Sequence, residues 1–174
     1  MRRVGPSTWV ALIAVLLVAA GAAAQEPIDE MAIFEPLLGS AWAGRFQDSS
    51  APQVDHVVEW NTILDGQVVR WSKRVDALGF EMETTFYWDR ELAVVTFVQL
   101  ASSGVHGQGT AWMEEGRLVL SGVSGQTSGA VEFRQTFEIL ADGTLEDRYF
   151  RRAGDAWAPQ HVIVYDRVRK EDHE

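Results

Sequence analysis

The chain has 174 residues, of which 25 are acidic, 15 are basic and none is cysteine. The formal net charge of −10 opposes binding to a phosphate backbone, so nucleic acid is excluded as a predicted partner. The lack of cysteine excludes a disulfide scaffold and a thiolate metal site, so stability must come from an apolar core. A chain of this length can bury such a core in one domain.

The first 24 residues have the layout of a secretory signal peptide. Arg2 and Arg3 give a positive start, the run WVALIAVLLVAA is apolar and uncharged, and small residues precede Gln25. The apolar run falls short of the ~20 residues that cross a bilayer, although an uncleaved anchor is the alternative. We predict a periplasmic or secreted protein with one domain over residues 25–174 and no stable membrane insertion after cleavage.

A short helix is predicted at the start of this domain. Ile28, Met31, Phe34 and Leu38 recur at the three- and four-residue spacing of one helical face. Pro36 would disrupt a long helix, so we expect one short helix or two turns.

Beyond residue 39 the apolar pattern has the period of two that is typical of strands. The stretches FEMETTFYW and VEFRQTFEI alternate, and turn signals such as LDGQ, EEGR and ADGT separate the alternating stretches. We expect about ten strands near residues 40–47, 53–63, 67–75, 79–88, 91–100, 104–113, 117–121, 131–140, 144–151 and 157–168.

The connections between these strands are short and contain no helical stretch, which indicates an antiparallel up-and-down meander. An open sheet of this size would expose two edges, and closure removes both. We therefore predict an all-β protein with a single closed antiparallel barrel. The Gly/Ser-rich segment GVSGQTSGA, residues 122–130, is predicted to be a loop between two strands.

Several short motifs resemble those of bacterial exported lipocalin-like proteins of unknown function, in the calycin group. They are LLGSAWAGRF, NTILDGQVVRWSKR, YWDRELAVVTFV, GQGTAW, FRQTFEILADGTLEDRYF and a terminal YDRV, and they span nearly the whole of residues 25–174. The resemblance implies a closed barrel with a short N-terminal helix and no established activity.

The same resemblance implies a structural pair. Calycin-group barrels carry a tryptophan in the first strand, and an arginine on the last strand stacks over it. Trp42 and Arg167 are the candidates here, although Gly39 precedes Trp42 by one residue more than in the family pattern. Such a contact is worth roughly 0.5–2 kcal/mol.

A more distant resemblance is to nitrobindin-like haem-binding barrels, whose iron ligand is a histidine late in the chain. Trp42 and Gly44 are similar to the start of these proteins, and His161 stands where the ligand would be expected. In a strand His161 shares a face with Ile163, and the opposite face carries three valines. Because the valine face is the more apolar, we expect it to face the interior and His161 to point outward, unless a bulge intervenes.

Aromatic side chains are the most suggestive feature for function. We expect an interior cavity that binds a small lipophilic molecule, or rings that simply fill the barrel. No Gly-x-Ser-x-Gly or His-Glu-x-x-His motif occurs, so the sequence indicates no reaction, no metal and no cofactor, with haem as the alternative.

We predict a non-catalytic carrier. The alternatives are a haem protein using His161 and a filled barrel acting in protein interactions. The sequence does not indicate the oligomeric state. The predicted lining residues are Trp71, Phe86, Trp88, Phe133 and Phe137.

Overall fold

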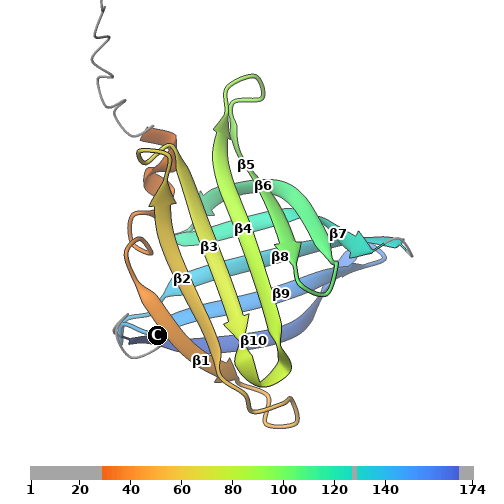
Figure 1. Ribbon diagram of the computed structural model, residues 1–174. Coiled ribbons are helices and arrows are strands. Elements are labelled where there is room, and N and C mark those ends of the chain that lie inside the picture. The colour runs from red at the N-terminus through yellow and green to blue at the C-terminus, as the bar shows by residue number, and fades with distance from the viewer. Residues whose placement is uncertain (1–28, 127–128, 169–174) are drawn as a thin grey trace, which may run out of the picture.

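The computed structural model describes residues 29–126 and 129–168, which form a closed antiparallel barrel (Figure 1). Each strand pairs with its neighbours along the chain, and β10 closes the barrel by pairing with β1. The ten strands are β1 (Ala41–Phe46), β2 (His56–Ile63), β3 (Val68–Val75), β4 (Phe80–Asp89), β5 (Val94–Ala101), β6 (His106–Glu114), β7 (Arg117–Gln126), β8 (Gly129–Ile139), β9 (Leu145–Ala153) and β10 (Ala156–Val168). The predicted fold class is confirmed. The predicted signal peptide, residues 1–24, lies outside the described residues.

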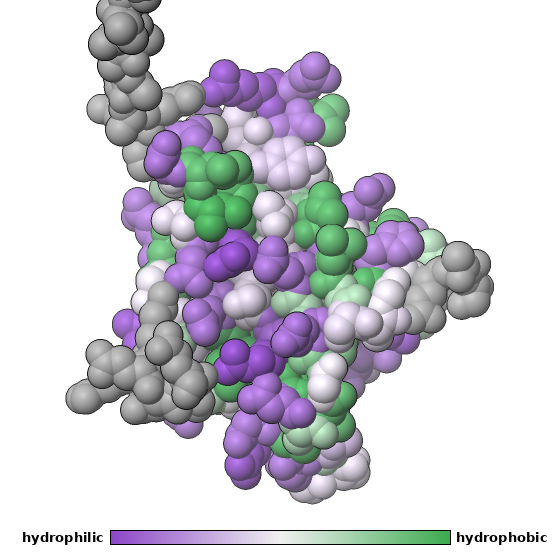
Figure 2. All heavy atoms as spheres, viewed as in Figure 1, coloured by the Kyte–Doolittle hydropathy of each residue, from purple (hydrophilic) through white to green (hydrophobic). Residues whose placement is uncertain are grey.

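Alternation along each strand decides which side chains enter the barrel. In β3 the inward residues Val69, Trp71, Lys73 and Val75 are all buried, whereas the residues between them are half-buried. The outward face is mixed: Figure 2 shows hydrophilic side chains over much of the visible surface, with apolar ones between them. No helix within the described ranges is long and apolar enough to cross a membrane.

The segment between β7 and β8 differs from the predicted loop. Most of residues 122–130 belong to the two strands, and Gly122 pairs with Phe133. A Cβ at Gly122 would lie 2.1 Å from the carbonyl oxygen of Gln108 on β6, so glycine is needed for close strand approach there. The glycine content therefore reflects close strand packing, and the prediction of a loop over the whole segment was wrong.

The N-terminal element is a 3₁₀ helix, η1 (Asp29–Phe34), followed by turns. An α-helix could not continue through Pro36, because proline has no N–H to donate to the preceding turn. Phe34 is fully buried, and its ring centroid lies 4.7 Å from that of Phe86. This element covers one end of the barrel, which we call the capped end. A second 3₁₀ helix, η2 (Asp76–Leu78), joins β3 to β4 at the other end, which we call the open end.

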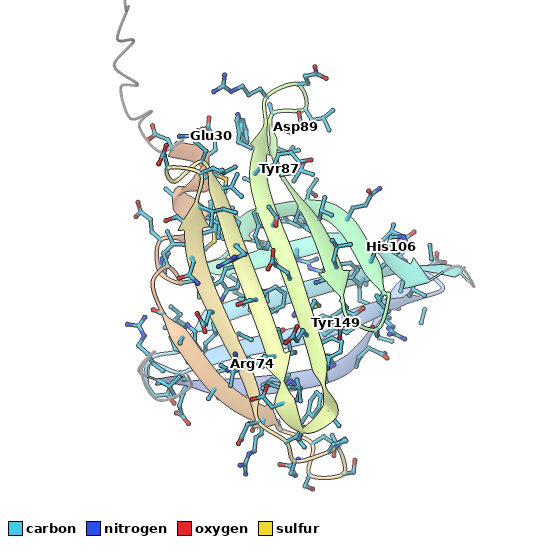
Figure 3. All side chains as sticks on the ribbon, in the orientation of Figure 1. Glu30, Arg74, Tyr87, Asp89, His106 and Tyr149 are labelled. Carbon is cyan, nitrogen blue, oxygen red and sulfur yellow. The ribbon has the colours of Figure 1, made fainter. Side chains whose placement is uncertain are left out.

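A packed group of aromatic rings fills the half of the interior below η1. Trp60 stacks on Trp71 with ring centroids 5.4 Å apart, and Phe137 meets both edge-on. Phe86 stacks on Trp60 at 5.8 Å. Figure 3 shows Glu30 and Asp89 near this end and Tyr149 toward the open end. The aromatic half supplies most of the large, fully buried side chains and hence much of the apolar burial that stabilises the fold.

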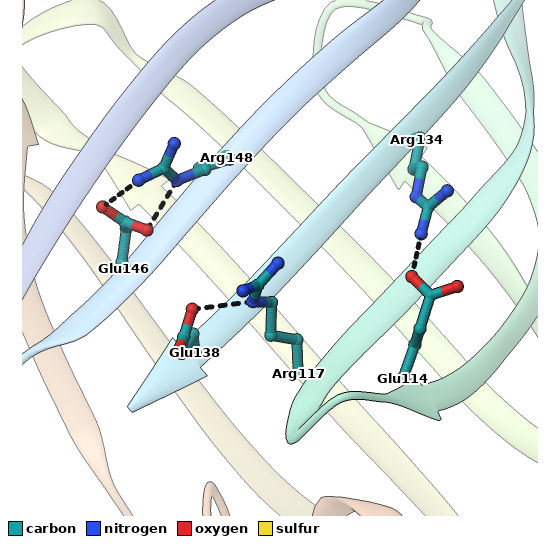
Figure 4. Close-up of polar contacts among 6 residues, drawn as sticks. All are labelled: Glu114, Arg117, Arg134, Glu138, Glu146 and Arg148. Atoms are coloured by element: carbon teal, nitrogen blue, oxygen red, sulfur yellow. Dashed lines mark hydrogen bonds and ion pairs between the residues drawn. The ribbon is translucent and has the colours of Figure 1, made fainter. Parts of the chain in front are cut away.

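The outer face of β6, β7, β8 and β9 carries ion pairs at the surface. Arg117 pairs with Glu138 at 2.9 Å, Arg148 binds Glu146 through two nitrogens, and Arg134 pairs with Glu114 (Figure 4). A surface hollow of about 370 Å³ lies among these residues. Exposed pairs of this kind contribute little to stability, and the hollow lies outside the barrel.

We expect Gly44→Ala to lower the free energy of unfolding by about 1–3 kcal/mol, because the new Cβ would overpack the closure between β1 and β10. That Cβ would lie 2.3 Å from the carbonyl oxygen of Val164 and 2.7 Å from the ring of Tyr165. Urea denaturation compares the variant with Ala43→Ser at the half-buried neighbouring position, for which a much smaller change is expected. An unchanged midpoint for Gly44→Ala would contradict the observed closure.

Candidate functional site: a cavity at the open end of the barrel

A cavity of about 220 Å³ opens at the end of the barrel opposite η1. Its wall is apolar on the side of β4 and the β5–β6 connection and polar on the side of β3, β8, β9 and β10. The residues around it are Lys73, Phe80, Met82, Gln99, Ala101, Ser103, Val105, Ser124, Gln135, Tyr149, Arg151 and His161.

The change from a packed core to a cavity occurs along the same rows of inward-facing strand positions. Two residues beyond an inward aromatic ring, the strand places an inward polar side chain: Lys73 follows Trp71, and Gln99 follows Phe97. On β8 the buried Gln135 lies between two buried phenylalanines. Toward the open end the interior is therefore mixed, with buried polar side chains among apolar ones such as Phe133 and Met82. We call this region the polar half, and the ring-filled region below η1 the aromatic half.

Some of the buried polar side chains in the polar half make hydrogen bonds with one another. The Gln99 side-chain amide donates to the Thr84 hydroxyl at 3.1 Å, and the Gln135 amide donates to Asp147 Oδ1 at 2.7 Å. The Tyr165 hydroxyl lies 3.5 Å from Asp147 Oδ2. Asp147 is completely buried, and burial raises the pKa of its carboxyl group, although Lys73, Gln135 and Tyr165 oppose that shift.

Lys73 is the unusual member of this group. Its side chain is almost entirely inside the barrel, with 8% of the residue exposed, and it lines the cavity. Over residues 29–126 and 129–168 its ammonium nitrogen makes no hydrogen bond and no ion pair. Burial lowers the pKa of the Lys73 amine, and the more distant carboxylate of Asp147 only partly opposes that effect.

His161 faces the cavity, so the prediction that it points outward was wrong. Ile163 and Tyr165, which share its face, are fully buried, whereas Val162 and Val164 are only half-buried. The register shifts between Pro159 and His161, but the alternation from His161 onward is regular. The prediction failed because it assumed that the more apolar face must be internal, and the interior at this end of the barrel is polar.

Two aromatic rings hold the His161 imidazole. It stacks on Tyr149 at 5.2 Å with an interplanar angle of 14°, and it meets Phe46 edge-on at 5.2 Å. Burial, with smaller contributions from Lys73, His56 and Arg151, lowers the pKa of His161 from 6.5 to about 4. The ring is therefore neutral at neutral pH.

His56 is a second buried histidine, which sequence analysis treated as an ordinary strand residue. It is 4% exposed, neither ring nitrogen has a hydrogen-bond partner, and its ring lies 4.6 Å from that of Phe46. Burial lowers its pKa to about 4. A signal was available, because His56 precedes Val58 and Trp60 with the period of two that places all three inside.

The five residues predicted to line a ligand cavity are not part of the wall of this one, although Phe133 stacks on the cavity residue Tyr149 at 5.7 Å. Trp71, Phe86, Phe133 and Phe137 are buried and Trp88 is half-buried, and all five belong to or pack against the hydrophobic core. None of them is among the residues around the cavity at the open end. The cavity residues that sequence analysis did not select include Lys73, Gln99, Gln135, Tyr149 and Arg151.

The structural pair inferred from the calycin resemblance is in contact. The Arg167 guanidinium lies 4.7 Å from the centroid of the Trp42 ring, and Trp42 is fully buried. The two residues are direct partners in the β1–β10 register. This contact lies near the capped end, away from the cavity.

Comparison with known proteins supports the fold. The structure is similar to the crystal structure of Rv2717c from M. tuberculosis, with a TM-score of 0.51 and 17% sequence identity over 83% of this chain and all of that one. No protein-family model matches the sequence, and no curated protein matches it. Within the described ranges no three histidine, aspartate or glutamate side chains are grouped as ligands for a metal ion.

We expect a drop in stability between pH 6.5 and 4 that depends on His161. Because its pKa is lower in the folded state, the unfolded chain binds a proton in this range that the folded protein does not. The contribution is complete above pH 6.5 and falls by about 1–2 kcal/mol as the pH approaches 4, after allowance for partial exposure. The measurement is urea denaturation across this range with His161→Phe, which keeps the ring and removes the titration. Equal acid sensitivity in the two proteins would contradict a neutral, buried imidazole.

Proposed function

We propose that this protein is a non-catalytic binding protein whose open-end cavity holds a small molecule with an apolar body and one carbonyl-type oxygen. The single observation that carries the proposal is Lys73, a buried amine at the cavity wall without a hydrogen-bond acceptor among the described residues. Because Lys73 lines the cavity, a ligand oxygen there would accept a hydrogen bond from the amine, and the apolar surroundings would strengthen that bond.

The two walls of the cavity favour an amphipathic ligand. Phe80, Met82 and Val105 offer apolar contact on one side. Across the cavity lie the rings of Tyr149 and His161, which stack on each other, and Phe133 stacks on Tyr149. A ring-bearing body between these walls would place its oxygen toward Lys73.

The size of the cavity limits the ligand. At about 220 Å³ it lies below the range of ~300–1,000 Å³ that is usual for drug-sized ligands. One or two fused rings with a short polar group fit this space. The proposal keeps the predicted lipophilic carrier and moves its site from the aromatic half to the polar half. Export and membership of the lipocalin-like group remain part of the same proposal.

We expect 2-naphthamide to bind, because it has two fused rings and a carbonyl oxygen. Lys73→Met should weaken binding about tenfold, the cost of one lost hydrogen bond from a buried donor. The measurement is calorimetric titration of the purified protein, with circular dichroism to establish that the variant folds.

The matched control is Arg74→Gln, since Arg74 follows Lys73 on β3, faces outward and pairs with Asp76. This variant should bind 2-naphthamide as the parent protein does. Equal affinity for Lys73→Met and the parent protein would contradict the proposed site. Failure of the parent protein to bind would favour the alternative of a filled barrel acting in protein interactions.

Haem binding is a second candidate, favoured by one observation and opposed by another. His161 faces the cavity with a neutral imidazole, which is the form that ligates a metal. The cavity, however, is too small for a group the size of haem. We therefore derive no step through haem and propose the smaller ligand.

Titration with haemin separates the two candidates. We expect no Soret band that depends on His161, and His106→Ala is the matched control on an exposed histidine. A Soret band that His161→Ala abolishes and His106→Ala preserves would replace the carrier proposal with haem binding.

A further inference from the structure

We propose that Lys73 captures small aldehydes covalently, as an imine, inside the open-end cavity. This inference rests on the ligand site proposed above and narrows its substrate class from carbonyl compounds in general to aldehydes. In this role the Lys73 amine acts as a nucleophile, whereas reversible binding needs it only as a hydrogen-bond donor.

The position of Lys73 supports this role. It is the only lysine in the described part of the chain, and the sequence contains just one other, Lys170. Its neighbours across the ladders are Val58 on β2 and Met82 on β4, which hold the stem of the side chain between apolar groups. The amine therefore ends in a confined space where an aldehyde ring can pack against apolar side chains.

The charge environment also favours a nucleophilic amine. Burial lowers the pKa of Lys73, and the groups that surround the cavity include few negative charges. Asp147 on β9 is the acid that acts on Lys73, and burial raises its own pKa. The other groups near the amine add no negative charge at neutral pH. His56 on β2 and His161 on β10 are neutral because their pKa values are lowered to about 4, and Arg151 on β9 is a base. The hydroxyl of Tyr165 on β10 stays protonated because its pKa is raised well above 10.

The chemistry needs only the amine and the aldehyde. The nitrogen lone pair attacks the carbonyl carbon, the C–N bond forms, and a proton moves from nitrogen to the carbonyl oxygen. The C–O bond of this carbinolamine then breaks, the hydroxyl leaves as water with the second proton of the nitrogen, and the C=N bond forms, so one amine and one aldehyde give one imine and one water. No oxidation or reduction occurs, and the open mouth lets the water leave.

The test uses 2-naphthaldehyde, which differs from 2-naphthamide in the group that reacts. The purified protein is incubated with the aldehyde and sodium cyanoborohydride, which reduces an imine to a stable secondary amine. Peptide mass spectrometry then locates the naphthylmethyl group. We expect modification at Lys73 to exceed that at Lys170 about tenfold or more near neutral pH, since each unit of pKa reduction raises the neutral fraction tenfold. An excess of 2-naphthamide should suppress it.

Two variants make the result specific. Lys73→Arg keeps a donor at the cavity but cannot form the imine, so it should still bind 2-naphthamide and lose the adduct. Lys170→Arg should keep the adduct at Lys73. Modification of Lys170 or the N-terminal amine in preference to Lys73 would overturn the inference. If 2-naphthamide binds and the Lys73 adduct is missing, the proposed function stands and this inference fails; if neither occurs, both fail.

Discussion

The closure of β10 onto β1 is the constraint from which the rest of this structure follows. A closed sheet has one inside, so every second residue of each strand must occupy the same limited space. Near η1 that space is filled by Trp60, Trp71, Phe86 and Phe137, with Phe34 inserted from the capped end. Toward the open end several of the same rows of inward positions carry polar side chains, such as Lys73, Gln99 and Gln135. The division of the barrel into a packed half and a half with a cavity is therefore a consequence of which residues follow the aromatic ones along each strand.

The polar half costs stability, and the aromatic half offsets that cost. Asp147 recovers part of its lost hydration through Gln135 and Tyr165, whereas Lys73 makes no such contact among the described residues. Large rings that are completely buried provide the apolar burial that makes such a group tolerable. Buried ionisable groups with shifted pKa values that line a cavity are typical of functional sites, which is why the proposals centre on Lys73 and not on the larger hollows of the outer surface.

Much of the fold could be predicted because it depends on local alternation and turn residues. The ten strands follow from that pattern, and the error at residues 122–130 arose because glycine that permits close strand approach looks the same as glycine in a loop. His161 could have been placed correctly: Arg167 lies on the same face of β10, and an arginine stacked over the buried Trp42 at a barrel end requires that face to be internal. Lys73 could likewise have been assigned to the interior from its spacing to Trp71. The cavity itself could not have been predicted from the sequence, because its size depends on how rings from strands far apart in sequence meet across the barrel.

The most direct test of this account is the pKa of the Lys73 amine. With only two lysines in the chain, ¹³C labelling at the lysine ε carbon gives two signals, and Lys170→Arg assigns them. We expect a titration midpoint for Lys73 below the ordinary lysine value of 10.5, because the effect of burial on the amine outweighs the attraction of the Asp147 carboxylate. A midpoint at or above 10.5 would show that the amine reaches solvent or pairs closely with a carboxylate, and it would contradict the polar half of the barrel as described.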